Sequence, residues 1–230
     1  MVGYYAATKS ICINIYLHIL KKKNFQYLPI MKKLLFATLI LSLSQITIAF
    51  SQEINTDITG KKMSDFIRLE AKLKGKVYQK GGDIIIPGGM EMPILYRRAQ
   101  KGIPDLTINY IFTKKDSVIH EIQYSWDPRN FEEGKPAAQS IEFDKALIKK
   151  YNLVLKELTV RFGASEAKND LTDLAKIDTN RGLSRSDSWT TKDGTKIYMS
   201  IILANHYKFD DNDNGDPLHK INIYVTTKRK

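Results

Sequence analysis

The chain has 230 residues, a formal net charge of +11 and one cysteine. Its positive charge is concentrated at the N-terminus, because residues 1–51 contain six lysines and no acidic residue. Subtracting these six from the 36 lysines and arginines leaves 30 basic residues against 25 acidic ones, a net charge of +5 for the remainder. The basic residues are spread as short pairs, without the dense basic patch typical of nucleic-acid-binding proteins, so we expect no nucleic-acid partner.

Residues 31–51 show the features of a secretory signal peptide. Two lysines precede the uncharged run Leu34–Leu43, and Ala49 and Ser51 are small residues at the positions that a signal peptidase reads. We expect cleavage between Ser51 and Gln52, which would yield a periplasmic or secreted protein. An uncleaved anchor is the alternative. The apolar stretch is short of the roughly 20 residues that span a bilayer, so we expect that the mature form does not cross the membrane.

The segment before the predicted signal peptide has a separate interpretation. A signal peptide begins at the initiator methionine, so we interpret Met31 as the true start and residues 1–30 as an upstream extension of the gene model. A genuine N-terminal extension is the alternative. The only cysteine, Cys12, lies in this segment. A mature protein without it has no disulfide, thiolate nucleophile or cysteine-ligated zinc.

The remaining chain is predicted to be a flexible leader over residues 52–62 and a single domain over residues 63–230. Apolar spacing predicts a short amphipathic helix over Met63–Leu73, ended by Gly75. Extended segments are predicted over residues 76–86 and, more weakly, over residues 92–98.

Two antiparallel hairpins are predicted further along the chain. In the first, Leu106–Thr113 and Val118–Trp126 both alternate between apolar and polar residues. In the second, the turn at Asp193-Gly194 joins residues 186–191 to residues 196–204. A final strand is predicted over residues 220–225. Each alternating strand predicts one buried and one polar face.

The longest helical pattern runs from Pro136 to Phe162 and has one broad apolar side. A helix followed by antiparallel strands therefore occurs twice, from Met63 and from Pro136. We predict an α+β fold in which an antiparallel sheet, made of two hairpins and further strands, is covered by a long and a shorter helix. One interpretation of this order is that the domain consists of two similar halves, each a helix followed by strands. The other is that any α+β domain of this size would show such an order of elements.

The acidic loop after the second hairpin contains oxygen ligands that calcium prefers. It resembles a helix–loop–helix calcium loop only in part, because Ile221 stands where a bidentate glutamate is needed and the flanks are predicted strands. We retain a loop-bound calcium or other divalent cation, stabilising a structural domain, as an alternative. No other cofactor is expected. The ligand candidates are Asp210, Asn212, Asn214 and Asp216.

Histidines supply the candidates for catalysis. His120 is predicted to share a strand face with Ile122, and His206 and His219 flank the acidic loop and are predicted to face each other. A histidine paired with a carboxylate would suit a hydrolase acting on an envelope polymer or peptide, which we keep as the alternative function. The sequence contains no nucleophile elbow, metalloprotease motif, phosphate loop or dinucleotide fingerprint.

The leading prediction is a binding or accessory protein of the cell envelope without catalytic activity. An envelope protein, a peptide or a glycan is the expected partner. Tyr124, Trp126 and Trp189 are the candidate ligand-binding residues, on the expectation that they form an exposed aromatic patch.

Overall fold

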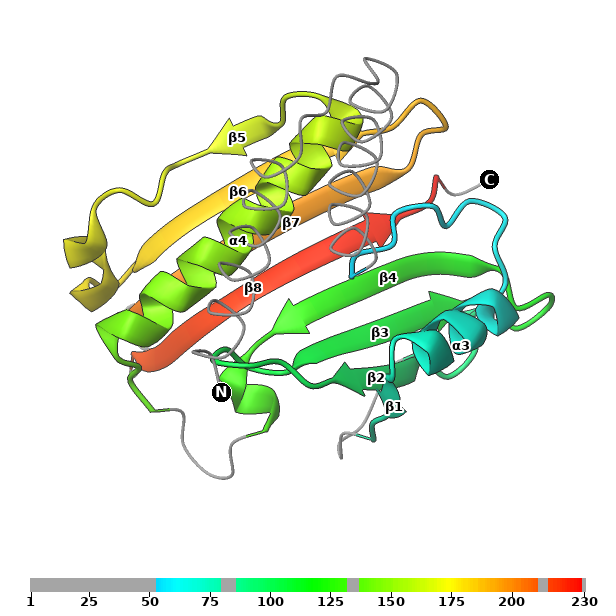
Figure 1. The fold of residues 1–230 in the computed structure, drawn as a ribbon, viewed down its shortest axis with the longest axis horizontal. Coiled ribbons are helices and arrows are strands. Elements are labelled where there is room, and N and C mark those ends of the chain that lie inside the picture. The colour runs from blue at the N-terminus through cyan, green and yellow to red at the C-terminus, as the bar shows by residue number, and fades with distance from the viewer. Residues whose placement is uncertain (1–52, 80–85, 132–136, 211–214, 229–230) are drawn as a thin grey trace, which may run out of the picture. The chain divides into compact units, whose positions relative to one another are not determined.

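The computed structural model describes residues 53–79, 86–131, 137–210 and 215–228 (Figure 1). The chain divides into residues 1–53 and a compact second unit, residues 54–230. The predicted upstream extension and signal peptide lie outside the described residues. Within the described ranges, no helix is both long and apolar enough to cross a membrane.

The second unit is built on one eight-stranded antiparallel sheet with the strand order β1-β2-β3-β4-β8-β7-β6-β5. The predicted α+β class with an antiparallel sheet is confirmed. The strands are β1 (Lys76–Val77), β2 (Ile94–Arg98), β3 (Leu106–Phe112), β4 (Ile119–Trp126), β5 (Glu166–Lys168), β6 (Leu183–Thr190), β7 (Lys196–Tyr207) and β8 (Asp216–Thr226).

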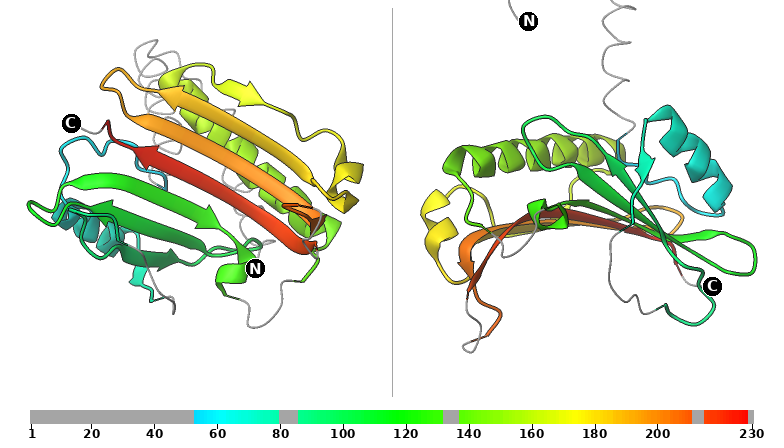
Figure 2. Two further views of the ribbon diagram at one scale, coloured as in Figure 1. Left: turned by 180° about the vertical axis from the view of Figure 1, so that it is seen from behind. Right: turned by 90° about the horizontal axis from the view of Figure 1, so that it is seen from below.

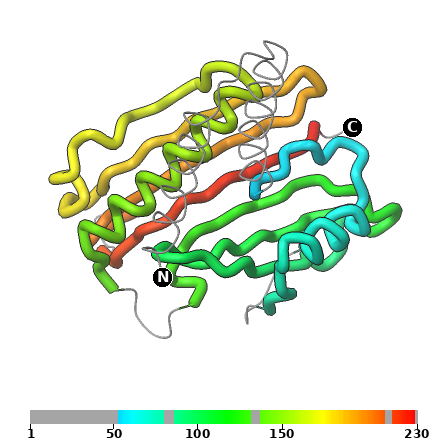
Figure 3. Tube along the Cα trace, viewed as in Figure 1, coloured from blue at the N-terminus to red at the C-terminus, as the bar shows by residue number. Residues whose placement is uncertain are grey.

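The described elements follow the same order twice along the chain. Helix α3 (Met63–Lys72) precedes β1 to β4, and helix α4 (Ile141–Phe162) precedes β5 to β8. The last strands of the two halves, β4 and β8, pair antiparallel at the centre of the sheet. If the two halves are exchanged, the strand order is therefore the same when it is read from the opposite edge of the sheet, as can be followed along the trace in Figure 3. Short 3-10 helices, η1 (Pro128–Asn130) and η2 (Leu174–Asp178), lie in the connections.

Both helices lie on the same face of the sheet, α3 over the first half and α4 over the second (Figures 1 and 2). The strands supply this face with apolar residues at every second position, and in β3 Leu106, Ile108 and Tyr110 are fully buried. Helix α4 buries Tyr151 and Leu158, among others, on the side that packs against the sheet. The core therefore lies between the helices and one face of the sheet.

Helix α4 begins at Ile141, five residues after the predicted start at Pro136. The hydroxyl of Ser140 caps the helix by accepting a hydrogen bond from the Phe143 amide (3.2 Å). At the end of α3, the residue with a positive φ is Lys74 (φ 58°), not Gly75. Gly75 still follows the helix, and its amide donates to the carbonyl of Glu70 (2.9 Å). The left-handed residue of the expected glycine cap is therefore Lys74.

The segment expected to be a flexible leader contributes side chains to the core. Ile54 and Ile58 are buried. The Asn55 amide donates to the Tyr124 hydroxyl (2.9 Å), which in turn donates to the Asn55 carbonyl (3.1 Å). The burial of these two isoleucines contradicts the expectation of a loose leader. Two isoleucines among polar residues are too weak a pattern to indicate burial from the sequence.

Candidate functional site: the uncovered face of the sheet

The face of the sheet opposite α3 and α4 carries no helix among the described residues (Figure 2, left). Side chains that alternate with the core residues of the strands lie on this face, and most are half-buried. They are mainly neutral amides, hydroxyls and phenols. We call them the polar sheet face: Asn109, Gln123, Ser125, Ser186, Ser188, Tyr198, Ser200, Asn222 and Tyr224.

Strand register aligns these residues, together with the buried Thr107, in two rows that cross both halves of the sheet. Within the second row, the Ser125 hydroxyl donates to the Asn222 side-chain oxygen (2.8 Å), which joins β4 to β8. The first row is Asn109, Gln123, Tyr224, Tyr198 and Ser188, and the second is Thr107, Ser125, Asn222, Ser200 and Ser186.

Two tyrosines form the centre of the first row. Tyr198 and Tyr224 are direct cross-strand partners, with ring centroids 6.3 Å apart and an interplanar angle of 37°. Tyr198 is 45% exposed. Burial raises the pKa of Tyr224, and the nearby Glu121 and Tyr198 raise it further. Tyr224 therefore stays neutral and presents a hydroxyl that can donate or accept a hydrogen bond.

A side-chain network holds part of this face in place. The Asn109 amide donates to the Gln123 side-chain oxygen (3.3 Å), and the Gln123 amide donates to Glu121 (2.6 Å). The Thr226 hydroxyl donates to the other oxygen of Glu121 (2.9 Å). The network links β3, β4 and β8, so these groups are oriented before any partner arrives, which lowers the entropic cost of binding.

Charged side chains on this face flank the two rows: Lys196 and Glu121 lie on either side of Thr226 next to the first row, and Lys220 lies beyond the second row. Burial lowers the pKa of Lys220, and the nearby Arg129 guanidinium lowers it further, against a smaller opposite effect of Asp127. The two rows thus present neutral donors and acceptors around two aromatic rings, with the charged Glu121 and Lys196 in the row beside them. Such an arrangement can bind through hydrogen bonds and aromatic contacts.

The aromatic residues proposed from the sequence lie elsewhere. Tyr124, Trp126 and Trp189 are at most 5% exposed and belong to the core under the helices, so the expectation that they form a surface patch is wrong. The Trp189 indole donates to the Gly163 carbonyl (3.0 Å). The aromatic pair on the uncovered face is instead the exposed Tyr198 and the half-buried Tyr224. Their position opposite the apolar residues of alternating strands was the signal that could have identified them.

His120 does not share a face with Ile122, contrary to expectation. The β3–β4 ladder shifts between the pairs Ile111–Glu121 and Phe112–Ile119, so His120 is the additional residue of a β-bulge. The bulge turns Ile119 into the core and leaves His120 half-exposed. Its Nδ1 atom lies 3.3 Å from the Thr227 hydroxyl. Strict alternation failed here because a bulge inserts one residue without a clear local signature.

The other two candidate histidines do not face each other. His206 is exposed, whereas His219 is buried under α4. His219 Nδ1 lies 2.7 Å from Asp144 Oδ1, and its Nε2 has no hydrogen-bond partner among the described residues. The expected His206–His219 pair is therefore wrong. The structure instead contains a carboxylate–imidazole pair formed by Asp144 and His219, which is enclosed between β8 and α4.

The predicted cation loop is only partly described. Asn212 and Asn214 lie outside the described residues, and Asp210 and Asp216 are exposed. In the described parts of the chain, no three His, Cys, Asp or Glu residues are grouped closely enough to hold a metal ion.

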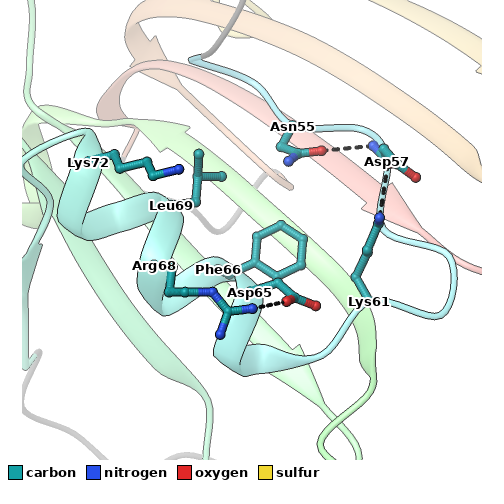
Figure 4. A pocket seen from close by; sticks show the side chains of 8 residues that line it. All are labelled: Asn55, Asp57, Lys61, Asp65, Phe66, Arg68, Leu69 and Lys72. Atoms are coloured by element: carbon teal, nitrogen blue, oxygen red, sulfur yellow. Dashed lines mark hydrogen bonds and ion pairs between the residues drawn. The ribbon is translucent and has the colours of Figure 1, made fainter.

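Two hollows of about 350 Å³ each lie away from the polar sheet face. The first, beside α3, has a lining that contains two ion pairs (Figure 4), since Lys61 pairs with Asp57 (3.5 Å) and Arg68 with Asp65 (2.5 Å). Its other lining residues are Asn55, Phe66, Leu69 and Lys72. The second is mostly apolar and is lined by Gly102, Ile103, Pro104, Pro128, Phe131, Gln139 and Phe143.

Neither hollow is lined by any of the histidines considered for catalysis. The polar sheet face is therefore the stronger candidate site. Compared with known protein families, curated proteins and solved structures, the chain matches none of them.

Proposed function

We propose that this protein is an exported binding protein of the cell envelope, without catalytic activity, that recognises a partner protein through its polar sheet face. The observation that carries this proposal is the uncovered sheet surface, where Tyr198 and Tyr224 lie among neutral amides and hydroxyls. The signal-like residues 31–51 support export.

The composition of the face favours a protein as the partner. Tyrosine provides a large, rigid contact area at low entropic cost, while serine and asparagine provide adaptable hydrogen bonds, and protein-binding surfaces are enriched in this combination. Charged residues are depleted at the centres of such interfaces. The rows run across five strands, and neither hollow lies on this face. A broad surface that lies apart from both hollows suits a folded protein better than a small molecule, which needs a concave site.

The experiment that tests this proposal is site-specific photo-crosslinking in the producing cell. A photoreactive residue would replace Ser200 on the polar sheet face and, in a matched control, Thr159 on the exposed side of α4. We expect a discrete protein adduct from position 200 that is absent from position 159. Equal adducts from both positions, or an adduct that disappears on glycosidase treatment, would contradict a protein partner at this face.

The partner identified in this way can then be purified and its affinity measured by calorimetry. We expect Tyr198→Ala and Tyr224→Ala each to weaken binding about tenfold or more, as truncation of central tyrosines does at other interfaces. Met92→Ala, at an exposed apolar residue outside the polar sheet face, is the control and should leave the affinity unchanged. Unchanged affinity in both tyrosine variants would contradict the proposed surface.

A further inference from the structure

The side of α4 that faces away from the sheet has an unusual composition. Lys145, Lys149 and Lys156 are exposed, and between and after them lie Leu153, which is 56% exposed, and Val160, which is 79% exposed. These five residues, which we call the lysine stripe, follow one another at intervals of three or four residues. They therefore lie along one side of the helix.

The stripe points away from the core. The residues of α4 that are buried against the sheet are Leu147, Tyr151, Val154 and Leu158. Because an α-helix rotates by about 100° per residue, these residues lie on the side of α4 opposite Lys149. In Figure 2 (right), α4 lies above the sheet with no described element on its outer side. The exposed leucine and valine thus have no cover within the described residues.

Acidic residues do little to balance the charge of the stripe. Asp144 is buried against His219, and Glu157 is half-buried and pairs with Arg161 (3.5 Å). The exposed acid on this side of α4 is Glu142, in the first turn. A helix side that serves only for solvation commonly carries intermixed acids and bases, so three lysines with two aliphatic residues need another explanation.

We infer that the lysine stripe docks the protein on an anionic lipid surface. Lysines near a membrane are attracted to anionic headgroups, and each strengthens association several-fold. Leu153 and Val160 can enter the boundary between headgroups and acyl chains, where burial of aliphatic carbon is favourable. An acidic polymer would attract the lysines equally but would gain nothing from the two aliphatic residues, which is why a lipid surface fits better.

Helix α3 on the same side of the sheet supports this orientation. Its exposed residues include Ile67 together with Arg68 and Lys72, so apolar and basic side chains also coexist there. The polar sheet face is on the opposite side of the sheet. Membrane docking would therefore leave that face directed away from the lipid, and the inference does not depend on the identity of any partner bound there.

The test measures which side of the full chain approaches the lipid. In a Cys12→Ser background, a fluorophore is attached at Asn152→Cys, beside the stripe, or at Ser188→Cys on the polar sheet face. Vesicles of phosphatidylcholine, with or without phosphatidylglycerol, carry a quencher on their headgroups. We expect quenching at position 152 only with phosphatidylglycerol, and at most weak quenching at position 188. Since residues 1–51 are the same in both proteins, membrane binding by that segment affects the two labels alike.

Two sets of variants separate the contributions. Lys145→Gln/Lys149→Gln/Lys156→Gln should reduce vesicle association at least tenfold, whereas Lys101→Gln/Lys114→Gln/Lys115→Gln, with the same loss of charge at other exposed lysines, should change it less than twofold. Leu153→Gln/Val160→Gln should reduce association several-fold, while Val77→Gln/Met92→Gln should not. Equal quenching at both labels, or equal effects of the two lysine sets, would overturn the inference.

Binding to a soluble acidic polysaccharide distinguishes the other anionic partner. Polygalacturonate without vesicles is the probe. Stripe-dependent binding to polygalacturonate, combined with vesicle association that is insensitive to Leu153→Gln/Val160→Gln, would overturn lipid as the ligand. Loss of vesicle association in both lysine and aliphatic variants would support it.

Discussion

Glu70 of α3 and Arg98 of β2 form a buried, two-point ion pair that fastens the helix to the sheet. Arg98 Nε donates to Glu70 Oε2 (2.9 Å) and Nη2 donates to Oε1 (2.6 Å), and the Tyr110 hydroxyl also donates to Glu70. Glu70 is fully buried and Arg98 is 6% exposed. The second half has a comparable group, in which Asp187 of β6 accepts hydrogen bonds from Arg185, Tyr151 and Ser165.

Replacing only one residue of the Glu70–Arg98 pair should strongly destabilise the fold. Arg98→Met leaves a buried carboxylate without its counter-charge, and we expect the free energy of unfolding to fall by about 3–5 kcal/mol. The double variant Glu70→Gln/Arg98→Met removes both charges and keeps an acceptor for Tyr110, so it should be more stable than Arg98→Met. Urea denaturation of both variants and of Glu70→Gln alone gives the three losses. A double variant whose loss equals the sum of the single losses would argue against coupling of the two residues.

Gly75 should not tolerate a side chain. A Cβ atom at this position would lie 2.0 Å from Glu70 Oε2, which cannot retreat because Arg98 holds it in the core. We expect Gly75→Ala to reduce the free energy of unfolding by about 2 kcal/mol or more. Gly88→Ala is the control, since nothing lies within 4 Å of its added Cβ and its φ is not positive. Thermal unfolding of the two variants should therefore differ, and similar melting temperatures would contradict the predicted clash.

Asp187 should contribute to stability above acidic pH. Burial raises the pKa of its carboxyl group, but hydrogen bonds from Arg185, Ser165 and Tyr151 together lower it below the ordinary value. A lowered folded-state pKa gives stability that is present above the unfolded-state pKa of about 3.9 and is lost as pH falls through the folded-state value. The stability difference between the natural protein and Asp187→Asn should be largest above pH 4 and shrink below it. Urea midpoints measured from pH 7 down to pH 2 give this difference, and a constant gap would argue against the linkage.

Buried tyrosines should make the fold sensitive to alkali. Burial raises the pKa of Tyr110, Tyr124 and Tyr151 well above the ordinary value, and the neighbouring Glu70 and Asp187 carboxylates add to the effect at Tyr110 and Tyr151 respectively. A raised folded-state pKa gives stability that is complete below about pH 10 and is lost as pH rises, because the unfolded chain releases these protons first. Absorbance at 295 nm should show a late ionisation phase that coincides with loss of circular dichroism. In 8 M urea all tyrosines should instead ionise near pH 10, and a single native phase near that pH would contradict the prediction.

Local patterns predicted much of the sheet and its buried side. Leu106, Ile108, Tyr110 and Phe112 alternate with polar or less buried residues, and all four are buried. Alternation works because successive strand side chains point to opposite faces. It failed at His120, where the bulge between Ile119 and Glu121 shifts the alternation by one residue. It also gave no warning that Ile54, outside any predicted element, would join the core.

The site depended on information that alternation does not contain. Tyr198 and Tyr224 were recognisable as residues opposite the apolar positions, but their contact requires β7 to lie beside β8 in a particular register. The pair Asp144–His219 likewise joins a helix to a strand that follows it by 75 positions. Such contacts depend on the packing of distant elements, for which a short stretch of sequence carries no direct signal.

By itself, the sequence determined the α+β class and which residues of the regular strands avoid water, because both follow from local periodicity. The tertiary structure alone decided that β4 and β8 meet at the centre of the sheet and that α3 and α4 lie on the same face. Each half could have placed its helix on either side of a continuous sheet without changing its own periodicity. Placement of both helices on one side buries a common core, and it leaves Tyr198 and its polar neighbours uncovered on the other side.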